Sequence, residues 1–294
     1  MKCAIGLDIG GTKIEGALVS EKGKIIDIYR IPTQARKGRK QVLKNIVSVI
    51  SELKRRNKQK TTGIGAGIPG FADKSGKIVN MPNVPLLGFN LRDFLKKRFR
   101  CLVSVENDAN CFALGEYTFG AGKKASMLLG LIVGTGIGCG IVADGRIVSG
   151  CEGGAGEIGH ILRDTGAKKL MIGRNDFEAF CSGPNISKRF VRADGKKQDS
   201  HPAKIFASKT KIAKKIVSEE YRYLGMLLGS VVNMLNPDRI VLGGGVSKAI
   251  SPPKLKPEIA RFSIPFSAKR VKIVKSRLGE RAAVLGAAAL VFRH

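Results

Sequence analysis

The sequence predicts an α/β protein made of two similarly built lobes with a cleft between them. Two stretches, LDIGGTKIEGALVSEKGKII from Leu7 and LIVGTGIGCGIVADGRIV from Leu131, share the plan strand, glycine turn, strand, polar glycine turn, strand. Elsewhere, apolar runs alternate with helical patterns, which is typical of a mostly parallel sheet with crossover helices. The 294 residues are enough for two lobes with substantial cores. The internal repeat therefore indicates a duplicated architecture.

The first half begins with three predicted antiparallel strands, over 3–9, 13–20 and 25–30, which are joined by tight turns. A helix over 41–56 follows from apolar residues at helical spacing: Val42, Ile46, Val49, Ile50 and Leu53. Buried strands are expected at 61–68 and 102–106, and the second should lead into a helix over about 109–117.

The second half repeats this start with strands over 127–133, 137–143 and 146–149. A long helix over about 212–235, a strand over 239–242 and a final helix over about 280–292 follow. We expect the final helix to cross back to the first lobe. The first lobe would then comprise 1–117 plus 279–294, and the second lobe 118–278.

Charge is the unusual bulk property, because 52 basic and 23 acidic residues give a net charge of +29. Such a charge is compatible with nucleic-acid binding. The basic residues are scattered among apolar ones, however, and aromatic residues make up only 6% of the chain, without a ladder for base stacking. We therefore expect a basic surface and no specific nucleic-acid partner.

The uncharged stretch 125–143 has the length of a membrane span, which needs about 20 apolar residues. Glycines at alternate positions from Gly134 to Gly140 interrupt it, so we expect two buried strands around a turn. The N-terminus has no signal-peptide apolar segment. The six cysteines show no C-x-x-C pair and no zinc-finger spacing. These features predict a reduced, cytoplasmic protein without a membrane segment.

Two glycine turns are candidates for binding phosphate. Asp8 ends the first buried strand and is followed by Gly10, Gly11, Thr12 and Lys13, where glycines allow backbone N–H groups to approach an anion. Asp8 could hold Mg²⁺ through water; the alternative is an ordinary hairpin turn capped by the carboxylate. The second turn, 134–140, has four glycines at alternate positions, which weaken a sheet unless another group approaches closely. The chain has no P-loop, and GAGIPG over 65–70 is a poor start for the helix of a dinucleotide site.

Two polar segments are candidates for binding an acceptor. Asp108, in ENDAN over 106–110, follows a strand and could accept the proton of an attacking hydroxyl, or it could simply cap the next helix. The loop EGGAGEIGH over 152–160 carries Glu157 and His160, and Glu178 follows it. These side chains could hydrogen-bond a polyhydroxyl ligand or lie at the surface. Three histidines without clustered cysteines make a zinc site improbable.

Taken together, these motifs resemble the ROK family (repressor, open reading frame, kinase) of sugar kinases. The matching stretches run in family order over nearly the whole chain: GLDIGGTKIEGALV, GIGAGIPGFAD, VENDANCFALGE, GTGIGCGIVADGRIVSGCEGGAGEIGHI, EAFCSGP and NPDRIVLGGGVS. The resemblance implies the two-lobe, actin/hexokinase-like (ribonuclease H-like) ATPase fold.

The resemblance also implies roles for individual residues. Asp108 matches the catalytic base. The positions that match sugar-binding ones are Asn83, Asn107, Asp108, Glu157, His160 and Glu178, and Gly70 lies on the loop facing the sugar. The positions that match ATP-binding ones are Asp8, Gly10, Gly11, Thr12, Gly134, Thr135, Gly136 and Gly138, with Gly243, Gly244 and Gly245 against the adenosine.

One departure from the family pattern concerns zinc. Family members usually hold zinc with the histidine that matches His160 and with three cysteines, but those cysteine positions are Lys169, Met171 and Asp176 here. The resemblance therefore predicts no structural zinc in this chain. Without a metal to fix its tautomer, His160 needs another hydrogen bond to orient it.

The resulting prediction is an ATP-dependent hexose kinase that uses ATP and Mg²⁺. Glucose is the first substrate, with fructose, mannose, allose or an N-acetylhexosamine as alternatives, and the resemblance favours a homodimer. Two other hypotheses stay open: that the protein is a catalytically inactive sugar- or ATP-sensing protein, or that it is a nucleic-acid-associated regulator. The retention of both glycine turns together with Asp108 favours the kinase. The chain begins directly in the first phosphate strand, so a DNA-binding regulator would need another basic surface.

Overall fold

The computed structural model describes residues 2–57, 59–163, 173–193 and 196–293. The chain forms two compact units. The first comprises residues 1–124, 140–155 and 280–294, and the second comprises 125–139 and 156–279. The lobe limits expected from the sequence, 1–117 plus 279–294 and 118–278, stay a prediction.

The first unit is built on a five-stranded sheet with the order β3-β2-β1-β4-β7. The strands β1 to β3 pair antiparallel, whereas β4 is parallel to both β1 and β7. The strands of this unit, including the small hairpin β5-β6, are β1 (Cys3–Ile9), β2 (Lys13–Ser20), β3 (Ile25–Pro32), β4 (Thr61–Ile68), β5 (Phe71–Ala72), β6 (Ile78–Asn80) and β7 (Leu102–Asn107). The antiparallel start and the parallel continuation confirm the predicted strand pattern.

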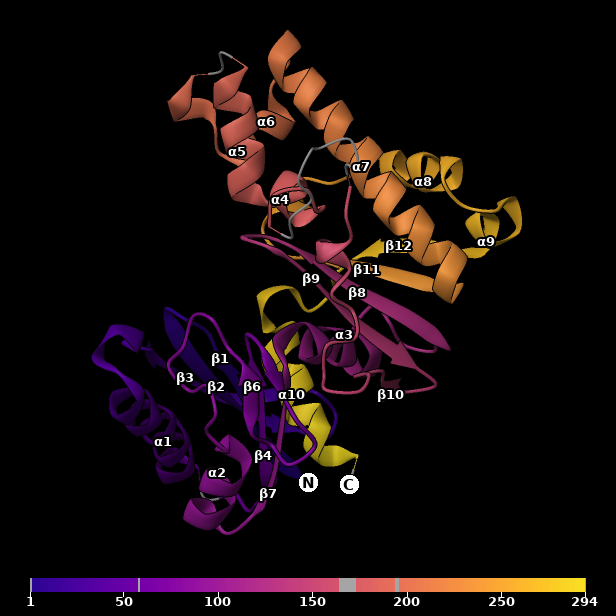
Figure 1. Cartoon of the computed structure of the whole chain (residues 1–294). Coiled ribbons are helices and arrows are strands. Elements are labelled where there is room, and N and C mark those ends of the chain that lie inside the picture. The colour runs from indigo at the N-terminus through magenta and orange to yellow at the C-terminus, as the bar shows by residue number, and fades with distance from the viewer. Residues whose placement is uncertain (1, 58, 164–172, 194–195, 294) are drawn as a thin grey trace. The chain divides into compact units, whose positions relative to one another are not determined.

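Four α-helices accompany this sheet: α1 (Arg39–Arg56), α2 (Leu91–Phe99), α3 (Asp108–Phe119) and α10 (Ala282–Phe292). Although α10 is at the end of the chain, it packs against α3, β1 and β4 (Figure 1). Glycines make this close packing possible, because a Cβ on Gly65 would overlap the carbonyl oxygen of Ala287 and one on Gly286 would overlap that of Cys111. Gly65 therefore lies in a strand under a helix, and the GAGIPG segment opens no helix.

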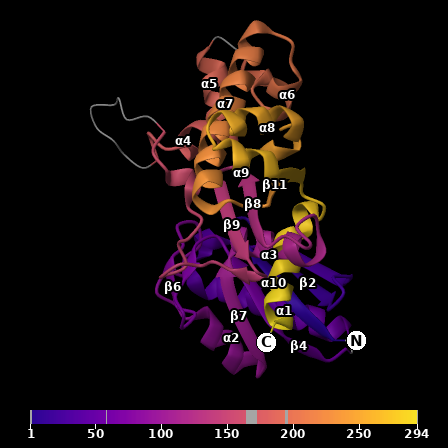
Figure 2. The same cartoon turned by 90° about the vertical axis from the view of Figure 1, so that its right-hand side faces the viewer.

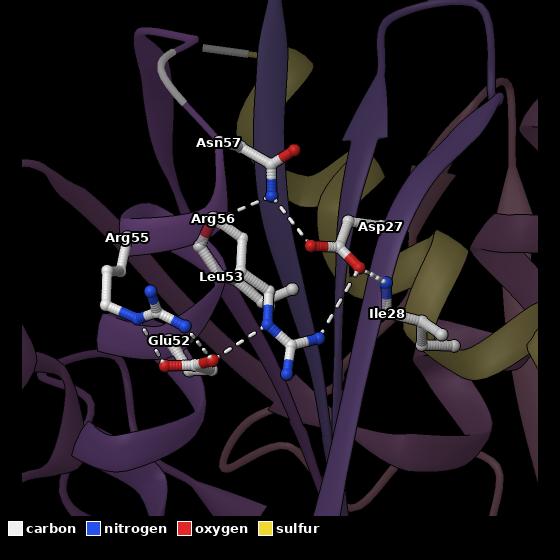
Figure 3. Close-up of polar contacts among 7 residues, drawn as sticks. All are labelled: Asp27, Ile28, Glu52, Leu53, Arg55, Arg56 and Asn57. Carbon is white, nitrogen blue, oxygen red and sulfur yellow. Dashed lines mark hydrogen bonds and ion pairs between the residues drawn. The ribbon is translucent and has the colours of Figure 1, made fainter.

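The end of α1 is tied to β3 by a small polar network (Figure 3). Glu52 accepts hydrogen bonds from Arg55 and from Arg56, which hold the pKa of this carboxyl low, at about 2. Asp27 of β3 accepts a hydrogen bond from Asn57 Nδ2 at 2.8 Å and lies 3.9 Å from Arg56. The network fixes the position at which the chain leaves α1.

The second sheet has the order β10-β9-β8-β11-β12, and β11 is parallel to both β8 and β12. Its strands are β8 (Met127–Val133), β9 (Ile137–Ala143), β10 (Arg146–Ile147), β11 (Arg239–Gly243) and β12 (Lys272–Lys275). The helices of the second unit are α4 (Glu178–Cys181), α5 (Gly183–Arg192), α6 (Pro202–Ala207), α7 (Lys211–Leu235), α8 (Pro252–Arg261) and α9 (Pro265–Arg270). The long helix α7 packs along α8, as Figure 2 shows.

The two sheets confirm the internal repeat. In each, the first three strands in sequence order pair in order at one side, and the two later strands continue on the side of the first strand. Several predicted boundaries differ from the observed ones by one or two residues. The third strand of the second half ends early, at Ile147, and the final helix begins with a 3-10 turn, Gly279–Arg281. No helix in the described part of the chain is long and apolar enough to cross a membrane, and 125–143 forms strands.

Candidate functional site

The carboxyl ends of β1 and β7 bring acidic residues to one edge of the first sheet. Asp8 pairs in register with Gly67 of β4, and Gly67 pairs with Glu106 of β7. Because the three strands are parallel, their carboxyl ends lie at the same edge, where ligands bind in open α/β sheets. Burial raises the pKa of the Cys111 thiol well above its usual value, and the negative charges of Glu106, Asp108 and Asp8 raise it further. All three carboxylates are therefore near this thiol.

Asp8 is suited to a cation at this edge. Its burial raises the pKa of the carboxyl, which the charge of Lys13 partly opposes. A cation near Asp8 would stabilise the ionised form that burial disfavours. Within the described residues, no group of three or more histidine, cysteine, aspartate or glutamate side chains is arranged to hold a metal. A single carboxylate fits Mg²⁺, which is usually held by one or two carboxylates together with waters and substrate phosphates.

The first glycine turn is held by hydrogen bonds at Gly10, while its tip is exposed. Gly10 N donates to Lys13 O at 2.9 Å, and Thr33 Oγ1 donates to Gly10 O at 2.5 Å. Thr12 is exposed at the tip. The exposed Asn83 lies beside the turn, since a Cβ on Gly11 would be 3.3 Å from Asn83 Cβ. Predicted phosphate-side and sugar-side residues are therefore neighbours within this unit.

Asp108 is not the cap of α3, because Asn107 occupies that position. Asn107 Oδ1 accepts hydrogen bonds from Ala109 N at 2.9 Å and Asn110 N at 3.2 Å, while its Nδ2 donates to Gly70 O at 3.1 Å. Asp108 is the first helical residue. The sequence left capping and proton transfer as alternatives for Asp108, and its neighbour performs the capping.

Glu106 was not predicted from the sequence as part of this site. Its Oε1 accepts hydrogen bonds from Asn107 N at 2.9 Å and from Asn110 Nδ2 at 3.0 Å. Glu106 therefore braces the strand–helix junction on which Asp108 is carried. The local signal was present in the sequence, because an acidic residue directly before an Asn N-cap can reach the first backbone N–H groups.

The second glycine turn, between β8 and β9, is tied to the α4–α5 segment. Gly134 N donates to Gly136 O at 2.9 Å, and Gly183 N donates to Gly134 O at 2.8 Å. Glu178 Oε2 accepts the backbone hydrogen of Ile137 at 2.7 Å. A Cβ on Gly136 would lie 2.5 Å from the same carboxylate oxygen, so the glycine makes room for Glu178. Thr135 is exposed at the tip of the turn, and Gly138 lies in β9.

The glycines after β11 lie next to this turn. Gly244 has φ +88°, and a Cβ there would be 2.5 Å from Val133 O. Gly243 ends β11, and a Cβ on Gly134 would lie 3.9 Å from Gly245 N. The predicted phosphate turn and the predicted adenosine-side glycines are therefore together in the second unit.

Glu157, His160 and Glu178 form the predicted sugar-side cluster. Glu157 Oε2 lies 3.6 Å from His160 Nε2. Burial raises the pKa of Glu157, His160 opposes that rise, and the charge of Glu178 adds to it. The three side chains thus lie close enough to influence one another and could together hydrogen-bond several hydroxyls of one ligand.

The hydrogen-bond partner that His160 was expected to need is the carboxylate of Asp176. The Nδ1 atom of His160 lies 2.9 Å from Asp176 Oδ2, and the Asp176 side chain has no exposed surface. This role could not be predicted from the sequence, where Asp176 stands out only as a position at which a family cysteine is missing. The other two positions, Lys169 and Met171, lie outside the described residues.

Each unit therefore gathers its own set of predicted residues. The first unit has Asp8, Gly10, Gly11, Thr12, Lys13, Asn83, Asn107 and Asp108, and the second has Gly134, Thr135, Gly136, Gly138, Glu157, His160, Glu178, Gly243, Gly244 and Gly245. Their roles in binding and catalysis stay a prediction.

Comparison with known proteins gives consistent matches over the whole chain. The model of the ROK family matches residues 4–294. A glucokinase from Halalkalibacterium halodurans is 33% identical over 98% of this chain and 94% of its own length. An N-acetyl-D-glucosamine kinase from Histophilus somni is 31% identical over 97% of each chain. The structure resembles a ROK family glucokinase from Streptomyces griseus in complex with glucose and AMPPNP, with a TM-score of 0.81 and 26% identity over 99% of this chain and 100% of that one.

Proposed function

The chain belongs to the ROK family, and we propose that it is an ATP-dependent hexose kinase that transfers the γ-phosphate of ATP to a hexose hydroxyl. One observation carries the proposal beyond family membership. The parallel register of β1, β4 and β7 brings Asp8, beside a glycine turn, to the same sheet edge as Asn107 and Asp108. A phosphoryl-transfer enzyme needs a cation-binding carboxylate and a proton acceptor near each other.

In this mechanism Asp108 accepts the proton of the attacking hydroxyl. It is carried on the first turn of α3, and the cap by Asn107 and the brace by Glu106 limit its movement. Positioning of this kind makes a general base effective, with contributions of about 10²- to 10⁴-fold. Mg²⁺ held near Asp8 would neutralise charge on the phosphates. Backbone N–H groups of the two glycine turns would bind the phosphate oxygens.

Glucose is the first candidate among the acceptors. Glu157, His160 and Glu178 offer several hydrogen-bonding atoms suited to a polyhydroxyl ligand. The H. halodurans relative is a glucokinase, and the S. griseus structure was solved with glucose. The H. somni relative acts on N-acetyl-D-glucosamine, so this sugar belongs in any substrate panel.

An ADP-release assay with ATP and a panel of sugars tests the proposal. The panel contains glucose, N-acetylglucosamine, mannose, fructose and allose, each with and without Mg²⁺. We expect sugar-dependent ADP release that requires Mg²⁺ and is highest with glucose. ATP hydrolysis that no sugar stimulates, or sugar binding without turnover, would refute the kinase and favour the sensing protein.

Assembly and location complete the proposal. We infer a homodimer, which the family resemblance favours, and a cytoplasmic location, which fits an enzyme that uses ATP and whose six cysteines, all among the described residues, form no disulfide in the structure. Light scattering coupled to gel filtration measures the assembly directly, and a mass near 31.5 kDa would show a monomer.

A further inference from the structure

The buried carboxylate of Asp176 accepts three hydrogen bonds. Its Oδ2 accepts from Gly173 N at 2.6 Å, and its Oδ1 accepts from Ala179 N at 2.8 Å. His160 Nδ1 is the third partner, at 2.9 Å. Burial alone would raise the pKa of Asp176, but these hydrogen bonds outweigh it and hold the pKa below its usual value. Asp176 is therefore ionised near neutral pH.

An ionised carboxylate accepts hydrogen bonds and donates none. The hydrogen of His160 that points at Asp176 must therefore be on Nδ1. The same hydrogen bond raises the pKa of His160, so the neutral ring is present above that raised pKa, and there this tautomer leaves Nε2 with a lone pair and no hydrogen. Nε2 is the ring atom on the side of Glu157, at 3.6 Å from its carboxylate.

Asp176 also anchors the start of α4, which carries Glu178. Ala179 N, which donates to Asp176, is in the first turn of that helix. Next to Asp176, Phe177 N donates to Ile161 O at 3.1 Å, and this bond joins the α4 segment to the segment that carries His160. A single buried side chain thus lies between two of the residues expected to bind the sugar.

We propose that Asp176 is a positioning residue for the sugar acceptor, because it holds His160 as the Nδ1–H tautomer so that Nε2 accepts a hydrogen bond from a hexose hydroxyl. The inference rests on the proposed function as a hexose kinase. Asp176 acts through His160 and through the position of α4.

Asp176→Asn tests the proposal with minimal change in shape. Asparagine keeps only one acceptor oxygen for the three N–H groups that meet Asp176, so at least one of Gly173 N, Ala179 N and His160 Nδ1 loses its acceptor. We expect the KM for the sugar to rise about 10- to 100-fold, the size of effect produced by an unpaired or reversed buried hydrogen bond. The KM for ATP should change less than about threefold, because uniform binding of the sugar is what is lost. Asp199→Asn is the matched control, an exposed aspartate of the same unit paired with Lys204.

The tautomer itself can be read by ¹⁵N NMR of the imidazole rings, because the chain has only three histidines. His160→Gln assigns the His160 signal, and His201 is an internal reference, since its Nδ1 accepts from Ala203 N and so carries no hydrogen. Above the raised pKa of His160, where the ring is neutral, we expect its single hydrogen to be on Nδ1 in the wild type. In Asp176→Ala, which leaves Nδ1 without its acceptor, the hydrogen should shift to Nε2.

Three outcomes would overturn the proposal: an Nε2–H tautomer in the wild type, a tautomer that Asp176→Ala leaves unchanged, or an unchanged KM for the sugar in Asp176→Asn. If Asp176→Asn fails to fold, the wild-type spectrum and the sugar KM of His160→Gln still decide. A wild-type protein that phosphorylates no hexose would refute the proposed function, while the spectrum would still report on Asp176.

Discussion

Replacing Gly136 by alanine should damage sugar use while leaving the fold intact. The new Cβ would lie 2.5 Å from Glu178 Oε2, whereas an ordinary contact is about 3.4 Å or longer. The flexible end of Glu178 can move away, so the cost to folding is modest. That movement of about 1 Å would break the hydrogen bond from Ile137 N, now 2.7 Å long. A misplacement of about 1 Å near a reacting centre can cost about 10²-fold in rate.

The assay is kcat/KM for glucose together with the melting temperature. We expect kcat/KM to fall about 100-fold, and the free energy of unfolding to fall by about 1.5 to 3 kcal/mol, the value of a hydrogen bond to a charged group. Gly154→Ala is the matched control, because a Cβ there meets nothing within 4 Å and the backbone needs no positive φ. If Gly136→Ala keeps kcat/KM within threefold of the wild type, Glu178 does not act where this geometry puts it.

Three further predictions address the base, the core and pH. Asp108→Asn should lower kcat about 10²- to 10⁴-fold while glucose binding, measured by calorimetry, is retained; normal turnover would show that another group is the base. Gly65→Ala should destabilise the protein by about 3 kcal/mol or more in urea unfolding, since the helix backbone at Ala287 cannot move aside easily, and a loss under 1 kcal/mol would contradict the packing of α10 on β4. The hydrogen bond to Asp176 raises the pKa of His160 above its usual value. Protonated His160 therefore stabilises the fold fully below about pH 6.5, and this stabilisation is lost as pH rises through the raised pKa. The contribution should be no more than about 1 kcal/mol for this partly exposed side chain, and unfolding of His160→Gln should lack this pH dependence.

Much of the sheet structure could be predicted because its signals are local. The strands Cys3–Ile9, Lys13–Ser20, Thr61–Ile68 and Met127–Val133 have the predicted limits, since each is an apolar or alternating run that ends at a glycine or polar turn. The helix α2 was missed because only Leu91 and Leu95 are buried in it, among lysines and arginines. Short helices such as α2, α8 and α9 depend on tertiary packing more than on their own sequence.

The candidate site, too, could be predicted only in part from the sequence. Motif residues such as Asp8, Asp108 and Gly134 could be proposed from the chain alone. The hydrogen bonds that organise them could not, because the partners are far apart in sequence: Glu178 reaches Ile137 across 41 residues, and Asp176 reaches His160 across 16. The sequence did require a partner for His160, but only the fold could show which side chain provides it.

The two glycine turns occupy equivalent places in the repeat but are held by different means. The first is closed by a hydrogen bond within its own hairpin and by Thr33, whose carbonyl oxygen accepts a hydrogen bond from Asn45 of α1. The second depends on Glu178 and Gly183, which belong to the segment that also carries the predicted sugar contacts. Movement of α4 would therefore change both the position of the Glu178 carboxylate and the support that it gives to the turn at Gly136 and Ile137. If these residues bind as proposed, this shared segment couples the sugar side and the phosphate side of the second unit.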